Sequence, residues 1–172
     1  MSSLLRSRVL LAVAVLLVGA VASYLYFRGG DSDTYEEGIT TGYLVTDVMI
    51  PLLDGDTVKF SDYKGELLVV DFMAPWCPPC KEQFKVLKEL NEHPEVEIIT
   101  INIDSRYNSS ALRQFAEDEG ITWSFGSSAL AGGVYQVSAI PTILFVDDDG
   151  VIRYRGFYTT LNQFEELLQS IG

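Results

Sequence analysis

The chain has 172 residues, 48% of them hydrophobic, which suits one domain with a real core and an appendage. Its formal net charge is −12, and all 24 acidic residues lie after residue 30, while Arg6, Arg8 and Arg28 come before it. Such an acidic surface repels phosphate backbones, which argues against nucleic acid as a partner.

The first 28 residues differ from the rest of the chain. Val9–Phe27 carries no charge and is about 19 residues long, close to the roughly 20 that a helix needs to span a bilayer. Arginines before this segment and acidic sequence after it predict a single-pass membrane anchor with the following domain outside the cytoplasm. The alternative is a signal peptide cleaved at AVAS, Ala20–Ser23, which would leave a secreted or periplasmic protein.

A polar, acidic linker is predicted over residues 29–41, and a globular domain over 42–172. The domain opens with an extended segment, YLVTDVMI (43–50), and a hairpin, LLDGDTVKF (52–60), that turns at Asp54-Gly55. The next segment, ELLVVDFM (66–73), is apolar enough to be a central strand that is buried on both faces.

The remaining elements alternate between helices and strands. A helix over 78–93 places Phe84, Leu87 and Leu90 on one apolar stripe. The last helix begins at Thr160, an N-cap for which Gln163 completes a capping box. Between these helices we expect a strand, a helix, a short strand, a short helix and a hairpin, over 95–104, 109–120, 121–125, 129–137 and 142–157. This order predicts an α/β fold, a mixed central sheet flanked by helices with an N-terminal β-hairpin extension.

The only two cysteines, Cys77 and Cys80, stand where the central strand gives way to a helix. A helix start offers unpaired N–H groups and a positive dipole end, which favour a thiolate at Cys77. Cys80 lies one turn on and can form a disulfide with Cys77, so thiol exchange could run in two steps. Pro78 suits the first turn, where a missing N–H costs little, and Pro79 further stiffens the loop.

Two alternatives for the cysteine pair involve no exchange. A structural zinc site needs four ligands, yet no second cysteine pair exists and the only histidine, His93, lies at the far end of the helix. A purely structural disulfide would usually close a longer loop. Both alternatives fit the sequence less well than a redox-active pair, so we expect no metal and no cofactor beyond the Cys77–Cys80 disulfide.

Two stretches, VVDFMAPWCPPC (69–80) and AIPTILFVDDDG (139–150), together resemble the thioredoxin superfamily. The lead-in LLDGDTVKFSDYKGELLVVDF (52–72) is similar to that of the membrane-anchored or periplasmic TlpA-like and ResA-like thiol-disulfide oxidoreductases. The resemblance implies a thioredoxin fold over roughly Gly42–Gly172. It also implies that Cys77 is the nucleophile and Cys80 the resolving thiol.

The resemblance assigns a substrate-binding role to the residues around the cysteines. Pro141 matches the family's cis-proline, which would leave backbone groups of Ala139 and Ile140 free to bind an extended substrate chain. Trp76 matches the aromatic neighbour of the nucleophile, and Pro78 and Pro79 complete the surface of the loop. Without the resemblance, Pro141 would read as an ordinary proline at the start of a strand. Trp123 is expected to belong to the core.

Asp71 interrupts an otherwise apolar strand, and its burial would raise its pKa. In thioredoxins an aspartate at this position helps to deprotonate the resolving thiol, so we expect a catalytic role for Asp71. Many TlpA-like proteins have instead a glutamate three positions after the second cysteine. This chain has Gln83 there and departs from that pattern.

The resemblance predicts an extracytoplasmic oxidoreductase that exchanges dithiol and disulfide with protein substrates. The reducing direction is favoured, as in proteins that keep the haem-attachment cysteines of apocytochromes reduced, with a membrane electron donor. Three alternatives stay open: a disulfide-forming oxidase, a redox-inert peptide-binding module and a copper-delivery protein of the same fold. Copper delivery would want a histidine near the thiols, and His93 is poorly placed for that.

Overall fold

The computed structural model describes Leu17, Gly19 and residues 35–171. The predicted anchor or signal segment over 1–28 otherwise lies outside these residues, so both readings of it stay predictions. Within the part that is described, no helix is long and apolar enough to cross a membrane. One compact unit begins at Tyr35.

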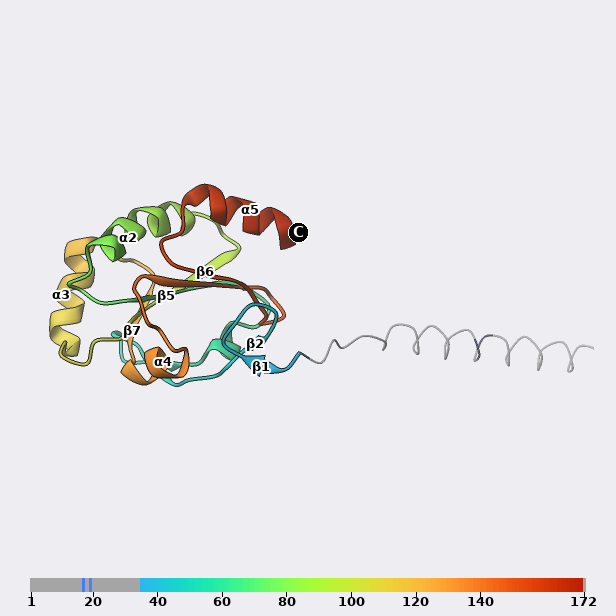
Figure 1. Ribbon diagram of the computed structural model, residues 1–172, viewed down its shortest axis with the longest axis horizontal. Helices are drawn as coiled ribbons and strands as arrows, with labels where there is room; N and C mark the ends of the chain where they lie inside the picture. The colour runs from blue at the N-terminus through green and yellow to red at the C-terminus, as the bar shows by residue number, and fades with distance from the viewer. Residues whose placement is uncertain (1–16, 18, 20–34, 172) are drawn as a thin grey trace, which may run out of the picture. The chain divides into compact units, whose positions relative to one another are not determined.

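A five-stranded mixed sheet forms the centre of this unit (Figure 1). The strands lie in the order β7-β6-β5-β8-β9. The first three are parallel to one another, whereas β8 runs antiparallel to β5 and β9 antiparallel to β8. Their bounds are Leu67–Met73 (β5), Val96–Asn102 (β6), Ser124–Ser127 (β7), Thr142–Val146 (β8) and Ile152–Gly156 (β9). The arrangement confirms the predicted mixed sheet.

Strand β5 lies in the middle of the sheet because its sequence suits burial on both faces. Its residues from Leu68 to Met73 are all buried. Side chains alternate along a strand, so Val69 and Met73 join one buried cluster while Val70 and Phe72 join the other. The buried strand predicted over 66–73 is therefore confirmed.

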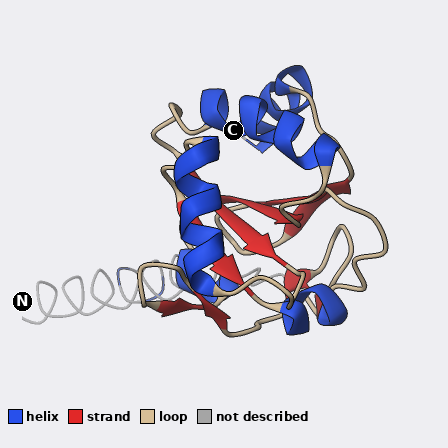
Figure 2. Cartoon of the chain, turned by 90° about the vertical axis from the view of Figure 1, so that its left-hand side faces the viewer, coloured by secondary structure: helices blue, strands red, loops and turns tan. Residues whose placement is uncertain are grey.

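Helices cover the sheet on both sides. Figures 1 and 2 show α2 (Pro78–Leu90) and α5 (Leu161–Ile171) on one side and α4 (Ala129–Val134) on the opposite side. The predicted stripe of α2 is fully buried, and the capping box of α5 forms, with the Thr160 N–H donating to Gln163 Oε1 at 2.9 Å. Helix α3 (Ser109–Glu119) begins after Asn108, whose side chain accepts a hydrogen bond from the N–H of Ala111.

The segment before β5 forms small strand pairs. β3 (Ile50–Pro51) and β4 (Thr57–Val58) make a hairpin that turns at the predicted Asp54-Gly55, with Gly55 at a positive φ of 113°, although its first strand lies just before the predicted range of 52–60. A 3-10 helix, η1 (Phe60–Tyr63), leads on towards β5. β1 (Glu37–Gly38) pairs in parallel with β2 (Leu44–Val45). Two residues of the stretch predicted as a linker, Glu37 and Gly38, therefore take part in strand pairing.

Candidate active site

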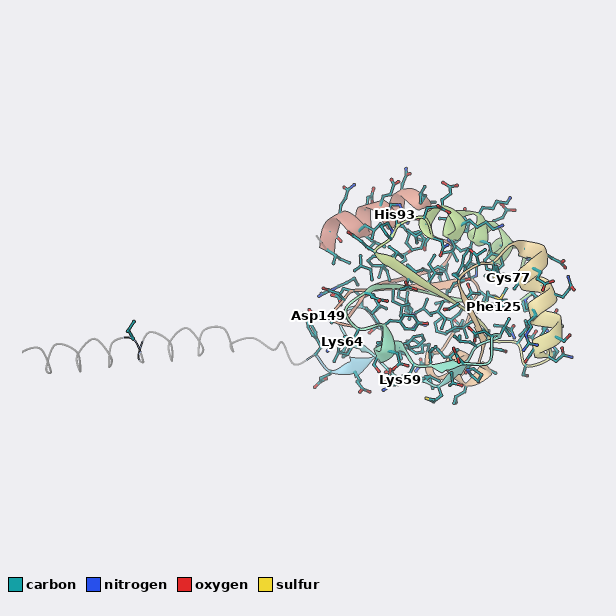
Figure 3. All side chains as sticks on the ribbon, turned by 180° about the vertical axis from the view of Figure 1, so that it is seen from behind. Lys59, Lys64, Cys77, His93, Phe125 and Asp149 are labelled. Atoms are coloured by element: carbon teal, nitrogen blue, oxygen red, sulfur yellow. A yellow bond between two sulfur atoms is a disulfide. The ribbon has the colours of Figure 1, made fainter. Side chains whose placement is uncertain are left out.

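Cys77 and Cys80 are joined by a disulfide at the start of α2, with their Cα atoms 5.3 Å apart. Cys77 is the N-cap of the helix, and its Sγ accepts a hydrogen bond from the N–H of Cys80 at 3.2 Å. Pro78 and Pro79 occupy the first two helical positions, as expected, and both are exposed. Figure 3 shows Cys77 at the end of the domain away from Asp149.

The helix start favours a negative charge on the sulfur of Cys77. The N–H group that already points at this sulfur would bond a thiolate more strongly, and the dipole of α2 adds to the effect. Both cysteines are buried in the oxidised protein, with Cys77 2% exposed and Cys80 0% exposed. The place of Cys77 at the helix start is consistent with the predicted order, in which Cys77 attacks and Cys80 resolves.

Trp76 stands beside the disulfide and is 55% exposed. Its indole N–H donates to Asp104 Oδ2 at 2.7 Å, and Arg106 Nε donates to Asp104 Oδ1 at 2.9 Å. These hydrogen bonds, led by those from Arg106, hold the pKa of Asp104 well below its usual range. A permanently charged Asp104 therefore anchors the ring of Trp76 while leaving much of its surface free for contact.

A groove of about 380 Å³ runs between Trp76 and the loop that ends in the Ile140–Pro141 bond. That bond is cis, as the resemblance implies. Sγ of Cys77 lies 3.6 Å from the carbonyl oxygen of Ile140, so the disulfide lies beside a residue that lines the groove. The carbonyl oxygen of Ala139 was expected to be free for a substrate, but it accepts a hydrogen bond from the hydroxyl of Thr142 at 2.7 Å.

Asp71 is fully buried in the middle of β5. It shares the face of Val69 and Met73, whose cluster also contains Cys77 and Cys80. Burial raises the pKa of Asp71 to about 7, against the lowering effect of a hydrogen bond from Thr100 to Oδ2 at 3.2 Å. Its other oxygen, Oδ1, has no hydrogen-bond partner among the described residues.

Gln83 is also fully buried, one turn beyond Cys80. Its Oε1 accepts the N–H of Thr159 at 2.7 Å, and its Nε2 donates to the carbonyl of Thr159 at 2.9 Å. An amide can make both bonds, whereas an ionised carboxylate has no hydrogen to donate. The side chain that replaces the glutamate of TlpA-like proteins therefore ties α2 to the loop before α5.

Other charged candidates lie away from the thiols. Glu82 is exposed and forms an ion pair with Lys85. His93 lines a separate cavity with Glu66, Glu95 and other acidic residues. Figure 3 shows His93 and Cys77 well apart, which leaves the copper hypothesis without its histidine.

The sequence did not single out Asp104, Arg106, Thr100 or Thr159, and it assigned Trp123 to the core alone. Asp104 could have been found, because it follows β6 and the carboxyl ends of the parallel strands β5 and β6 meet at one edge of the sheet. Trp123 packs against the core but is only half-buried, and its indole N–H is bonded.

Comparison with known proteins places this geometry in a family. Residues 41–155 match the AhpC/TSA family. The chain is 29% identical over 174 residues to the thiol-disulfide oxidoreductase ResA of Bacillus thuringiensis subsp. konkukian, covering 96% of this chain and 98% of that protein. It is 30% identical over 151 residues to the thiol:disulfide interchange protein DsbE of Vibrio cholerae serotype O1, covering 84% and 80%.

Solved structures share the fold. The thioredoxin domain of a thiol-disulfide oxidoreductase from Bacteroides vulgatus superposes with a TM-score of 0.68 at 19% identity, covering 78% of this chain and 100% of that chain. A DsbF homologue from Corynebacterium diphtheriae gives a TM-score of 0.66 at 21% identity, covering 83% and 94%. The chain belongs to the AhpC/TSA family, as a thioredoxin-like thiol-disulfide oxidoreductase similar to ResA and DsbE.

Proposed function

We propose that this oxidoreductase works outside the cytoplasm as a reductant of protein disulfides, with Cys77 as the nucleophile and Cys80 as the resolving thiol. The observation that carries the proposal is the Cys77–Cys80 disulfide at the start of α2, where Sγ of Cys77 lies 3.6 Å from the carbonyl oxygen of Ile140, a residue that lines the groove beside Trp76. A protein segment lying along Trp76 would bring its own disulfide to Sγ of Cys77.

The reaction proceeds in two exchanges that move two electrons to the substrate. The thiolate of Cys77 attacks one sulfur of the substrate disulfide, a mixed disulfide forms, and the other substrate sulfur leaves as a thiolate. Cys80 then gives up its proton and attacks Sγ of Cys77. This second step forms the disulfide seen in the structure and releases the other substrate sulfur as a thiolate, which takes up a proton.

Asp71 is the proposed acceptor of the Cys80 proton. A general base works best when its pKa lies near the working pH, and burial gives Asp71 a pKa of about 7. Gln83 cannot take this role because an amide does not titrate near neutral pH, and Glu82 points to solvent beside Lys85. Asp71 is the one carboxylate of β5, and its face of the strand packs against the buried cluster that contains both cysteines.

The reducing direction and the site of action rest on likeness to the ResA relatives and on the segment before residue 29. In this proposal Val9–Phe27 anchors the chain, a membrane protein supplies electrons, and the substrates include the haem-attachment cysteines of apocytochromes c. An uncharged span after two arginines supports an anchor with the domain outside.

A redox titration of the Cys77–Cys80 pair tests the direction. The oxidised and reduced forms are equilibrated with dithiol buffers of known potential and quantified by thiol alkylation. A reductant should have a potential near the about −270 mV of thioredoxin. A value near the about −120 mV of DsbA would identify a disulfide-forming oxidase instead.

A further inference from the structure

Thr100 lies directly opposite Asp71 in the sheet. The parallel pairing of β5 with β6 sets these two residues side by side, and both side chains are fully buried. Oγ1 of Thr100 is 3.2 Å from Oδ2 of Asp71. A hydroxyl can either donate or accept, so this distance alone does not say which protonation state of Asp71 it serves.

Trp123 occupies one acceptor site of that hydroxyl, which must donate to Asp71 whenever the carboxyl is ionised, because a carboxylate can only accept. Its indole Nε1–H donates to Oγ1 of Thr100 at 3.0 Å, and an indole N–H can only donate. One lone pair of the hydroxyl is therefore occupied, while the hydroxyl hydrogen is free to be given to Asp71. The three side chains form a row in which each donates to the next, from Trp123 through Thr100 to Asp71.

The row leaves the two oxygens of Asp71 in different states. Oδ2 receives the hydrogen of Thr100, whereas Oδ1 is buried without a partner in the part of the chain that the structure describes. A carboxylate held in this way has one oxygen engaged and one ready to take a proton. The difference between the two oxygens comes from Thr100 on β6 and from Trp123, just before β7.

We propose that Thr100 and Trp123 are positioning residues for the second exchange step: they hold Oδ2 of Asp71 so that Oδ1 receives the proton of the Cys80 thiol. The proton leaves Cys80 Sγ directly or through one water, and the resulting thiolate attacks Cys77 Sγ. This inference rests on the proposed exchange function and adds two residues that neither touch the substrate nor carry charge.

The surroundings of Asp71 contain no competing charge within the described chain. Strand β8 presents Ile143 opposite Asp71. The buried face of α2 presents Cys80, Gln83 and Phe84, and the buried residue of α5 is Phe164. The charged residues of these two helices are exposed; they are Lys81, Glu82, Lys85, Lys88, Glu89, Glu165 and Glu166. Once the disulfide is reduced, the titratable groups of the buried cluster beside Asp71 are the two thiols, and the phenols of Tyr107 and Tyr154 pack against that cluster, partly buried.

The test compares Thr100→Val with Thr100→Ser. Valine keeps the branched shape but removes the donor, so the carboxylate form of Asp71 loses its one hydrogen bond and the midpoint of its titration should rise by at least about one pH unit. Serine keeps the hydroxyl and should leave the midpoint within a few tenths. Trp123→Phe keeps a ring beside Phe84 but frees the hydroxyl, and should shift the midpoint in the same direction by less.

Two readouts separate this inference from the proposed function. Carbon-13 NMR of the aspartate carboxyls, recorded on the oxidised protein, follows Asp71 without any thiol titrating and without any substrate. Stopped-flow reduction of a small model disulfide follows both exchange steps across pH. In Thr100→Val the pH profile of the second step should move with the midpoint of Asp71, and the first step should keep its rate.

Three results would overturn the inference. One is an unchanged Asp71 midpoint in both Thr100→Val and Trp123→Phe. Another is a shifted titration midpoint of Asp71 with an unchanged pH profile of the second exchange step, which would leave the row of three side chains with a purely structural role. The third is an effect of Thr100→Val on the second step that persists unchanged in Asp71→Asn. A protein that reduces no protein disulfide but shows the predicted shifts would contradict only the proposed function.

Discussion

Replacing Asp71 by asparagine should change the pH dependence of stability in a defined direction. The pKa of Asp71 is about 7 in the folded protein, against 3.8 for an ordinary aspartate. Between these two values the folded state holds a proton that the unfolded state has lost. Its contribution to stability therefore falls as pH rises through this window, and the loss is complete above pH 7.

The size of the effect follows from the burial of Asp71. A pKa difference of about three corresponds to about 4 kcal/mol, an upper estimate for a fully buried group. Asparagine carries no such dependence. Its buried amide hydrogens lack a partner at the position of Oδ1, which costs about 1–3 kcal/mol at every pH. Asp71→Asn should therefore be neutral or destabilising near pH 4.5 and more stable than the parent chain near pH 8.5.

Urea unfolding of the oxidised proteins at several pH values measures this difference directly. The disulfide stays intact in both states, so the thiols do not titrate. The gap in unfolding free energy between variant and parent should change by about 3–4 kcal/mol from pH 4.5 to pH 8.5. Asp104→Asn is the matched control. The carboxyl of Asp104 in the parent chain has a lowered pKa, so the difference in unfolding free energy between this variant and the parent should be constant above pH 5. A constant gap for Asp71→Asn would refute the raised pKa and remove the argument for Asp71 as a base.

Further predictions address the neighbouring residues and the location of the domain. Gln83→Glu should lower the free energy of unfolding by about 1–3 kcal/mol at pH 8 and by less at pH 5, where a protonated glutamate can again donate to Thr159. Urea unfolding at both pH values checks this, and equal losses at the two pH values would contradict it. Asp104→Asn should weaken the anchoring of the Trp76 ring and raise KM for a protein disulfide more than it lowers kcat; an effect on kcat alone would speak against a binding role. A membrane-impermeant thiol reagent should label reduced Cys77 on intact cells, whereas labelling only after lysis would overturn the proposed topology. N-terminal sequencing should find no cleavage at AVAS, since a mature chain that starts at Ser23 would identify a signal peptide.

Local patterns in the sequence were sufficient for the fold but only for part of the site. The buried run of β5, the stripe of α2 and the capping box at Thr160 each follow from neighbouring residues, and each is confirmed. The cysteine pair and Pro141 were found because short motifs carry them. Trp76 and Asp104 lie 28 positions apart, and their hydrogen bond exists only because two parallel strands end at one edge.

The contacts that the sequence missed involve polar groups whose partners come from distant elements. Gln83 bonds the backbone of Thr159, 76 residues away, and backbone groups leave no mark in a sequence pattern. Trp123 was assigned to the core because aromatic residues usually belong there, yet its N–H donates a hydrogen bond to the hydroxyl of Thr100. The pairing of β1 was hidden for a different reason: an acidic, glycine-containing stretch resembles a linker even where two of its residues join a strand.

The central claim is that Cys77 attacks and Cys80 resolves, and trapping with Cys80→Ser tests it most directly. The reduced variant, incubated with an extract of the oxidised extracytoplasmic proteins, should accumulate mixed disulfides through Cys77, seen on a non-reducing gel and lost on reduction. Cys77→Ser, with Cys80 fully buried, should form none. Adducts in Cys77→Ser, or none in Cys80→Ser, would contradict the assignment of the two thiols.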